Sequence, residues 1–393
     1  MLVIIGSRLP FLLTYARRRK ERTTNYGDTM QNEVQTYHST RDQKSIRLFK
    51  AVLRWGGRIV IMGLAVLVVA IAYLSHVGEP SSASSMKFEG FIELPKDRIL
   101  NIFDYMALSN HTIFVGNMLS GSVVKVQLTN DHGGSGASVS EQRGAGNAHG
   151  IAMIPGEDKA FVTRSAENVV DVFQPSSLTL LGRIPIADDA DAIIYDPASR
   201  MIYVANGTPK LATIIDPVKL QTVATIPLGG VPEYPAADAQ HGVIYQNLHD
   251  TNEIAAVDLK TGSVVGRWQL APCVGPSGLA LDPVQSRLYA VCMGSSQLVV
   301  FSLEQHKVIA FLPVGGKPDS VALDLERHRI YTAGIQGVMT VIEQEGEDYR
   351  ILDNIHTHPF AHTLIVDPQT HRVYLTYAAL LSAPRIAVFS PKP

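Results

Sequence analysis

The chain has 393 residues, of which 46% are hydrophobic and 18% charged, a composition typical of globular proteins that excludes disorder over most of its length. The formal net charge of -2 is unevenly distributed, because residues 1–85 contain 12 basic and 5 acidic residues whereas the remainder contains 22 basic and 31 acidic residues. The body after residue 85 therefore has a net charge of -9, which repels polyanions and argues against nucleic acid as a partner.

The first predicted element is an apolar segment, residues 59–77, with no charged residue between Arg58 and Glu79. Its length is about that of a helix that crosses a bilayer. Basic residues are concentrated before it, so the positive-inside rule places residues 1–58 in the cytoplasm and exports the body. We therefore predict a transmembrane signal-anchor helix in the cell inner membrane, with the body on the periplasmic or extracellular side.

A cleaved signal peptide is the alternative, because the segment Ala70 to Ala72 has the small-x-small form of a processing site. Cleavage would give a secreted or periplasmic body. The start of translation also stays open between Met1 and Met30. The polar residues 78–87 are predicted to link the membrane span to the body.

The body repeats one turn motif. Asp-Pro or Asp-Leu pairs begin at Asp196, Asp282, Asp324 and Asp367, separated by 86, 42 and 43 residues. An aromatic residue opens an apolar run in each of seven repeats, at Phe114, Phe161, Tyr203, Tyr245, Tyr289, Tyr331 and Tyr374. A period of 40–45 residues with short strands is the signature of a β-propeller with one four-stranded blade per repeat. The sequence thus predicts an all-β, seven-bladed β-propeller over residues 88–393.

One repeat illustrates the expected blade. Its four strands are expected at residues 279–281, 288–291, 297–302 and 307–313. Asp282 and the proline after it begin the first turn, since proline presets φ and aspartate accepts backbone hydrogen bonds. The last repeat, 361–393, has room for three strands only. Residues 88–95 are therefore predicted to supply its outer strand and close the ring, and the glycine-rich stretch 133–146 is predicted to be a surface loop.

Three segments carry a family resemblance. The tetrapeptide Tyr-Val-Ala-Asn at 203–206 resembles the Tyr-Val-Thr-Asn of YVTN-repeat propellers, and residues 226–230 and 256–262 resemble later parts of that repeat. The region 88–393 is similar to YncE-like, YVTN-family seven-bladed propellers. The resemblance implies a secreted or periplasmic binding propeller and does not imply a defined reaction.

The loops that enter the innermost strands of a propeller meet at one mouth of its central channel. Counting six residues back from each turn proline, or its equivalent, gives positions spaced by 42 or 43 residues, with a shorter hairpin in the first blade. These ring positions are Asp104, His149, Asp191, Tyr234, Ser277, Asp319 and His362. We predict that they bind a ligand, and that Arg164 and Asn206, which follow second strands, face the same mouth. The alternative is structural, because such turns favour Asp and Ser for local backbone hydrogen bonds.

Asp104, His149 and His362 fall on three consecutive blades and are expected to lie closest together. They and the segment 356–362 have metal-ligand side chains but no recognised metal-binding spacing, so no metal and no other cofactor is predicted. The signatures of common catalytic sites, such as Gly-x-Ser-x-Gly and His-Glu-x-x-His, do not occur in the sequence.

The sequence therefore favours a non-enzymatic, membrane-anchored binding or scaffold propeller. Its ligand would be an unknown small molecule, peptide or envelope protein, bound at the channel mouth. Two enzymatic alternatives stay open. The first is a lactonase-like hydrolase, in which a metal ion held by the ring could polarise an ester. The second is an accessory subunit of a redox enzyme.

The two cysteines, Cys273 and Cys292, belong to one repeat. If the strands pair about the turn that begins at Asp282, Cys292 lies opposite Ser277, with Cys273 four residues further along. Export permits a disulfide between them. Two buried thiols are the alternative.

Overall fold

The computed structural model describes residues 62, 65–66, 79–96, 98–129, 137–144, 146–380 and 383–392. Residues 70–393 form one compact unit; in the other unit, 1–69, only Met62, Ala65 and Val66 are described, and they are helical. No helix in the described part of the chain is long and apolar enough to cross a membrane. The predicted segments 1–58 and 59–77 lie outside the described residues apart from those three positions, so the anchor stays a prediction.

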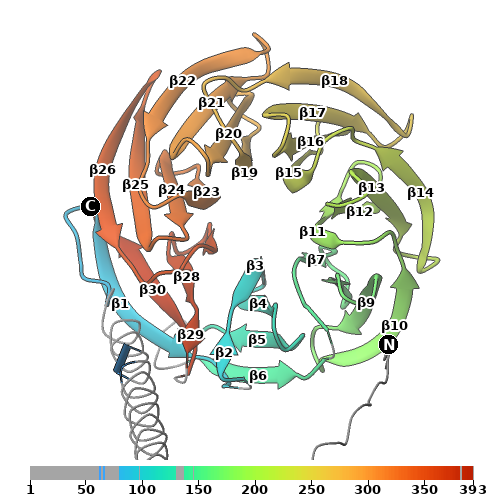
Figure 1. Cartoon of the computed structure of the whole chain (residues 1–393), viewed down its shortest axis with the longest axis horizontal. Helices are drawn as coiled ribbons and strands as arrows, with labels where there is room; N and C mark the ends of the chain where they lie inside the picture. Colours follow the sequence, from blue (N-terminus) through green and yellow to red (C-terminus); the bar gives the residue numbers. More distant parts are fainter. Residues whose placement is uncertain are drawn as a thin grey trace, which may run out of the picture. The chain divides into compact units, whose positions relative to one another are not determined.

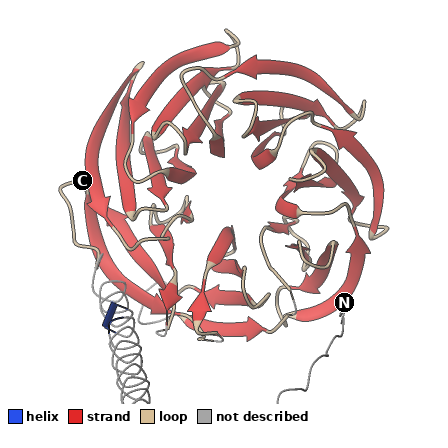
Figure 2. Ribbon diagram, viewed as in Figure 1, coloured by secondary structure: helices blue, strands red, loops and turns tan. Residues whose placement is uncertain are grey.

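Seven four-stranded antiparallel sheets are arranged in a ring around a common axis in the described part of the body (Figure 1), and the region at that axis is here called the channel. Each sheet is one blade, and successive strands of blades I to VI run from the channel outward. Figure 2 shows that the ring consists of strands joined by loops. The predicted all-β, seven-bladed propeller is confirmed.

The strand bounds of blades I to VI follow. Blade I contains β3 (Phe103–Ser109), β4 (Thr112–Asn117), β5 (Val123–Gln127) and β6 (Ser138–Gln142). Blade II contains β7 (Ile151–Met153), β8 (Ala160–Arg164), β9 (Val169–Gln174) and β10 (Thr179–Pro185). Blade III contains β11 (Ala190–Asp196), β12 (Met201–Asn206), β13 (Leu211–Asp216) and β14 (Gln221–Pro227). Blade IV contains β15 (Pro232–Asp238), β16 (Val243–Leu248), β17 (Glu253–Asp258) and β18 (Ser263–Gln269). Blade V contains β19 (Pro276–Asp282), β20 (Arg287–Cys292), β21 (Gln297–Ser302) and β22 (Lys307–Pro313), and blade VI contains β23 (Pro318–Asp324), β24 (Arg329–Gly334), β25 (Val338–Glu345) and β26 (Asp348–His356).

Blade VII joins the two ends of the body. Its strands are β27 (Leu364–Val366), β28 (Val373–Tyr377), β30 (Arg385–Pro391) and β1 (Met86–Glu93). The outer strand β1 pairs antiparallel with β30, and the rings of Phe88 and Phe389 lie 5.5 Å apart. A small separate sheet pairs β2 (Leu100–Asn101) with β29 (Ala379–Leu380). The predicted closure of the ring by the segment at 88–95 is confirmed.

The repeated turn gives the inner hairpins a constant geometry. In blade III, the carboxylate of Asp196 accepts hydrogen bonds from the backbone N–H of Ala198 at 3.1 Å and of Ser199 at 3.0 Å. Arg200 then adopts the left-handed conformation, with φ at 59°. Asp282 accepts the equivalent bonds in blade V. Because the turn has the same length in both blades, residues at a fixed distance before it reach the same height in the channel.

The aromatic residue that opens each apolar run is a core residue of its blade. All seven lie in second strands, and the most exposed of them, Tyr245, is only 9% exposed. Tyr203, for example, packs in a cluster with Ile226 of its own blade and Ile244 of the next. These clusters fill the space between neighbouring blades, which is the main apolar stabilisation of the ring.

Two details differ from the sequence expectation. The glycine-rich stretch 133–146 contains β6, the outer strand of blade I, because Val139 pairs with Val126 of β5. In blade V, Cys292 lies opposite Pro276 and not opposite Ser277. The cause is a bulge in β19, which inserts an extra residue that sequence counting does not detect.

Cys273 and Cys292 form a disulfide, with their Cα atoms 5.4 Å apart. Both residues are buried, at 3% and 0% exposure. The alternative of two free thiols is therefore set aside. The bond ties the loop before β19 to the end of β20, next to the channel mouth.

Candidate binding site at the channel mouth

Bulges in the inner strands present the ring side chains to the channel. In β3, Asp104 and Tyr105 lie between the paired positions Phe103 and Met106, so that two residues oppose one on β4. Irregularities of the same kind in β11, β15, β19 and β23 contain Asp191, Glu233 and Tyr234, Ser277, and Asp319. Two adjacent residues of one strand can therefore reach the mouth, and Tyr105 and Glu233 join the ring.

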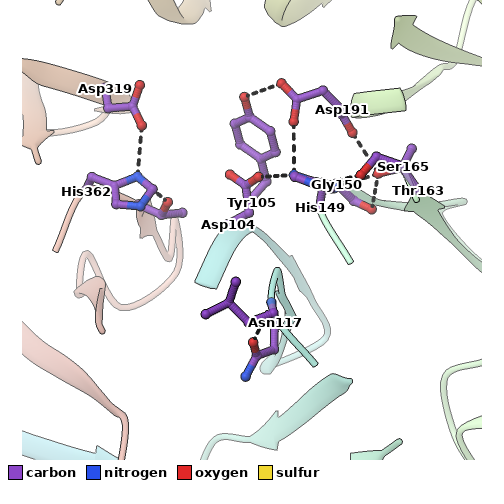
Figure 3. Close-up of polar contacts among 12 residues, drawn as sticks. Asp104, Tyr105, Asn117, His149, Gly150, Thr163, Ser165, Asp191, Asp319 and His362 are labelled. Atoms are coloured by element: carbon purple, nitrogen blue, oxygen red, sulfur yellow. Dashed lines mark hydrogen bonds and ion pairs between the residues drawn. The ribbon is translucent and has the colours of Figure 1, made fainter. Parts of the chain in front are cut away.

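His149 lies between two carboxylates from neighbouring blades (Figure 3). Its Nδ1 is 2.6 Å from Asp104 Oδ2 of blade I and 3.4 Å from Asp191 Oδ1 of blade III. Its other ring nitrogen, Nε2, is 3.0 Å from the Ser165 hydroxyl. Tyr105 donates a hydrogen bond of 3.3 Å to the second oxygen of Asp191. Side chains from three blades thus form one connected cluster.

A second pair lies elsewhere on the ring, where His362 Nδ1 is 2.8 Å from Asp319 Oδ2 (Figure 3). The structure therefore groups the ring differently from the sequence expectation. Asp191, and not His362, completes the close set with Asp104 and His149. The reason is that each histidine reaches sideways to the carboxylate of an adjacent blade, a direction that residue spacing does not encode.

The backbone beneath the cluster fixes the distance between blades II and III. Thr163 accepts a hydrogen bond of 2.8 Å from Gly150 N–H and donates one of 2.7 Å to the backbone oxygen of Asp191. A Cβ atom on Gly150 would lie only 2.9 Å from that same oxygen. The glycine therefore permits the close approach that brings His149 to Asp191.

The electrostatics of the mouth follow from this crowding. Burial opposes the protonation of His149, but Asp104 and Asp191 outweigh it and raise the pKa of His149 to about 10. Burial raises the pKa of Glu233 to about 9, and the negative charges of Asp191 and Asp319 act in the same direction. Asp319 also raises the pKa of His362 against the effect of burial. The mouth is thus a region where positive charge is stabilised and added negative charge is opposed.

A cavity of about 190 Å³ adjoins the ring. Three residues of the polar ring line this cavity: Tyr105, Tyr234 and Asp319. The centroids of the two tyrosine side-chain rings lie 4.9 Å apart. Inner-strand residues such as Leu279 and Val321 line its apolar part. The arrangement combines aromatic faces, a carboxylate and an apolar wall in one small space.

Arg164 has a structural environment. It is 1% exposed, and its Nε donates a hydrogen bond of 2.9 Å to the buried carboxylate of Asp171. A terminal nitrogen also donates to the backbone oxygen of Gly121 in the neighbouring blade. The structure thus places Arg164 inside blade II and not among the residues that line the cavity.

Ser277 and Asn206 are also used by the fold. Ser277 is 3% exposed and donates a hydrogen bond of 3.2 Å to the backbone oxygen of Pro318. Asn206 is fully buried, donates to the oxygen of Ala187 at 2.8 Å, and accepts from Thr213 at 2.8 Å. Both residues join loops or blades at the mouth.

Comparisons with known proteins support the fold. No family model matches the chain. Antigen Lp49 of Leptospira interrogans (serogroup Icterohaemorrhagiae, serovar copenhageni, strain Fiocruz L1-130) is 23% identical over 188 residues, which are 46% of this chain and 41% of that protein. The chain thus matches less than half the length of this curated relative.

Two solved structures resemble the chain at low sequence identity. Kuenenia stuttgartiensis hydrazine synthase has a TM-score of 0.60 at 15% identity, covering 75% of this chain and 93% of that one. The RRP9 WD40 repeats have a TM-score of 0.64 at 9% identity, covering 80% of this chain and 100% of that one. These likenesses show the β-propeller fold alone. Membership of the YVTN family stays a resemblance.

Proposed function

We propose that this protein is an exported, membrane-anchored binding propeller whose channel mouth takes a small organic cation. The observation that carries the proposal is the cavity of about 190 Å³ lined by Tyr105, Tyr234 and Asp319. Tyrosine faces attract ammonium groups through the ring quadrupole, and a carboxylate attracts them by charge. The apolar inner strands that continue the cavity suit the carbon skeleton of such a ligand.

The charge around the cavity supports a cation over an anion. The carboxylates of Asp104, Asp191 and Asp319 come from three blades, and His149 and His362 neutralise them only in part. The body as a whole also has an excess of acidic residues. A bound cation would relieve the mutual repulsion of these carboxylates, whereas an anion or nucleic acid would add to it.

The proposed location depends on two independent features. The apolar segment 59–77 with basic residues before it suits a single-pass anchor. The Cys273–Cys292 disulfide suits an oxidising compartment, because cytosolic thiols are kept reduced. Protease added to spheroplasts should degrade the body, whereas the same protease added to intact cells should leave the body undegraded. Protection of the body in lysozyme-treated, osmotically intact spheroplasts would contradict export.

Calorimetric titration of the full chain tests the ligand class. Choline is the cationic probe, and dimethylbutanol, its neutral carbon isostere, is the control ligand. We expect choline to bind and dimethylbutanol to bind at least tenfold more weakly, because the isostere loses the charge but keeps the shape. Binding of neither compound, or equal binding of both, would overturn the proposal.

Two variants assign the binding to the cavity. Asp319→Asn should weaken choline by roughly tenfold, a typical value for losing one partly buried charge interaction. Asp250→Asn is the matched control, because Asp250 pairs with Lys210 at 2.6 Å and does not line the cavity. Equal loss in both variants would mean that the overall charge, and not the cavity, attracts the probe.

Ester hydrolysis is a second candidate, favoured by one observation. Ser165 Oγ, His149 and Asp104 follow one another at 3.0 Å and 2.6 Å, in the order of a nucleophile, a base and an orienting acid. However, Asp191 is a second carboxylate at the same nitrogen, and Asp104 and Asp191 together raise the pKa of His149 to about 10 against the effect of burial, so the histidine is already protonated at neutral pH. A protonated imidazole cannot accept the serine proton, so we favour binding. Labelling of Ser165 by a fluorophosphonate probe at neutral pH would reverse this preference.

A further inference from the structure

We infer that Asp104, His149 and Asp191 form a binding site for one divalent transition-metal ion, separate from the cavity proposed for the organic cation. One ligand atom from each residue lies within 4.8 Å of the other two. The three residues come from blades I, II and III, whereas the cavity is lined by residues of blades I and IV to VII, none of them one of the three ligands. Tyr105 lines the cavity and also donates a hydrogen bond to Asp191, so it connects the two sites. The two sites share the mouth of the channel and use different donor atoms.

The chemistry of the donors defines the class of ion. An imidazole nitrogen with two carboxylate oxygens is a ligand set that suits Zn²⁺, Mn²⁺ and related first-row ions. Both carboxylates approach the same nitrogen, Nδ1 of His149, from different blades. The carboxylates of Asp104 and Asp191 thus bring two negative charges to one nitrogen atom. A divalent ion at that point would interact with both carboxylates at once.

The spacing requires only a small adjustment. Two donors bound tetrahedrally at about 2.0–2.1 Å from an ion lie about 3.4 Å from each other. Asp191 Oδ1 is already 3.4 Å from His149 Nδ1. Asp104 Oδ2, at 2.6 Å, would move away from the nitrogen by roughly 0.8 Å to reach the same spacing. The two carboxylate oxygens already lie within 4.8 Å of each other.

Neighbouring groups orient two of the three ligands, His149 and Asp191. An ion bound at Nδ1 displaces to solvent the proton that this nitrogen shares with the two carboxylates. Nε2 keeps its own proton and can donate a hydrogen bond to Ser165, which lies 3.0 Å away. Tyr105 donates to Asp191 Oδ2 and leaves Oδ1 for coordination. The side chains of His149 and Asp104 are only 12% and 11% exposed, which reduces competition from water. Outer hydrogen bonds of this kind are typical of metal sites and are not needed for a simple ion pair.

The first test is calorimetric titration of the chelator-treated full chain with ZnCl₂ and, separately, MnCl₂. We expect one ion per chain for at least one metal, and Asp191→Asn should weaken it by more than about tenfold. Asp188→Asn is the matched control. Asp188 lies on the loop just before β11, accepts a hydrogen bond of 2.7 Å from Asn168 at the surface, and is not one of the three ligands. Its substitution should change the affinity by less than about twofold.

Three outcomes of this titration would overturn the inference. They are binding of neither metal, an unchanged affinity in Asp191→Asn, and an equal loss in both variants. The second and third would assign the ion to surface histidines or to diffuse acidic charge.

The main readout of a second test uses the wild-type chain, so it does not depend on whether a variant folds. The wild-type chain loaded with Co²⁺ should show one strongly shifted, exchangeable proton resonance from the Nε2–H of His149, which the hydrogen bond to Ser165 protects from rapid exchange. Ser165→Ala should speed the exchange of that proton without removing cobalt. A Co²⁺-loaded chain with no shifted exchangeable resonance would contradict coordination through Nδ1.

Discussion

Asp104 of blade I and His149 of blade II are 45 residues apart in the chain, and their side chains approach to 2.6 Å. Asp319 of blade VI and His362 of blade VII repeat this arrangement at 2.8 Å. Each pair crosses a boundary between blades. The polar ring at the channel mouth therefore connects neighbouring sheets as well as forming the wall of a candidate binding site.

The metal-free chain should lose stability as pH rises through the alkaline range because of His149. Its pKa is about 10 in the folded chain, compared with 6.5 for the unperturbed side chain. The contribution is fully present below about pH 6.5 and is lost as pH rises toward 10. Histidine NMR titration measures it directly, and Asp104→Asn should lower the pKa of His149 by about one unit or more. An ordinary pKa for His149 in the wild-type chain would contradict the cluster.

Glu233 should add to the same trend. Its pKa is about 9 in the folded chain and 4.5 for the ordinary side chain, so the folded state retains a proton that the unfolded state releases. Stability therefore falls as pH rises from 4.5 toward 9. Glu233→Gln removes this effect and should stabilise the chain at pH 8 by on the order of 2 kcal/mol, with little change at pH 4. Urea unfolding at the two pH values measures the difference.

Glu304→Gln is the control for that experiment, because Glu304 is an exposed turn residue of blade V. It should leave the pH dependence of urea unfolding unchanged. If the two variants show the same pH dependence of the free energy of unfolding, then burial and the neighbouring carboxylates do not raise the pKa of Glu233.

The disulfide should contribute to the stability of blade V. Cys273 and Cys292 are separated by 19 residues, and closing a loop of that size in the unfolded chain is worth about 3 kcal/mol. The double variant Cys273→Ser with Cys292→Ser should lower the free energy of unfolding by about that amount, measured with denaturant. Mass spectrometry after alkylation should find no free thiol in the untreated protein, and modification of both cysteines before reduction would contradict the bond.

Arg164 should behave as a structural residue. Arg164→Met leaves the buried Asp171 with only its 3.0 Å contact to Arg183, and we expect a loss of about 3 kcal/mol in stability. Arg350→Met, which removes an exposed ion pair with Glu343, should leave the stability nearly unchanged, because solvent screens such a pair. A stable Arg164→Met variant that no longer binds choline would instead restore the ligand-binding role predicted from the sequence.

The repeat pattern in the sequence was sufficient for the architecture. The turn aspartates fixed the blade period, and the bounds expected for β21 and β22, 297–302 and 307–313, agree with the structure. The missing strand of the last repeat was also located correctly at β1. These features depend on local turn chemistry and on strand length, both of which a single sequence contains.

The pairing of side chains at the mouth could not be obtained in the same way. Residue counting assumes one ring position per blade, but a bulge directs both Asp104 and Tyr105 into the mouth. Which carboxylate meets His149 depends on how neighbouring sheets are placed, and Gly150 controls that distance. A charged residue in an apolar strand did offer one local signal: Asp171 between two buried valines predicts a buried partner, and Arg164 is that partner.

A crystal structure of the full chain grown with choline would test the binding proposal most directly. The account predicts electron density for the ammonium group between Tyr105, Tyr234 and Asp319, inside the cavity that they line. Choline density at another surface, or a cavity that contains only water at saturating choline, would contradict it.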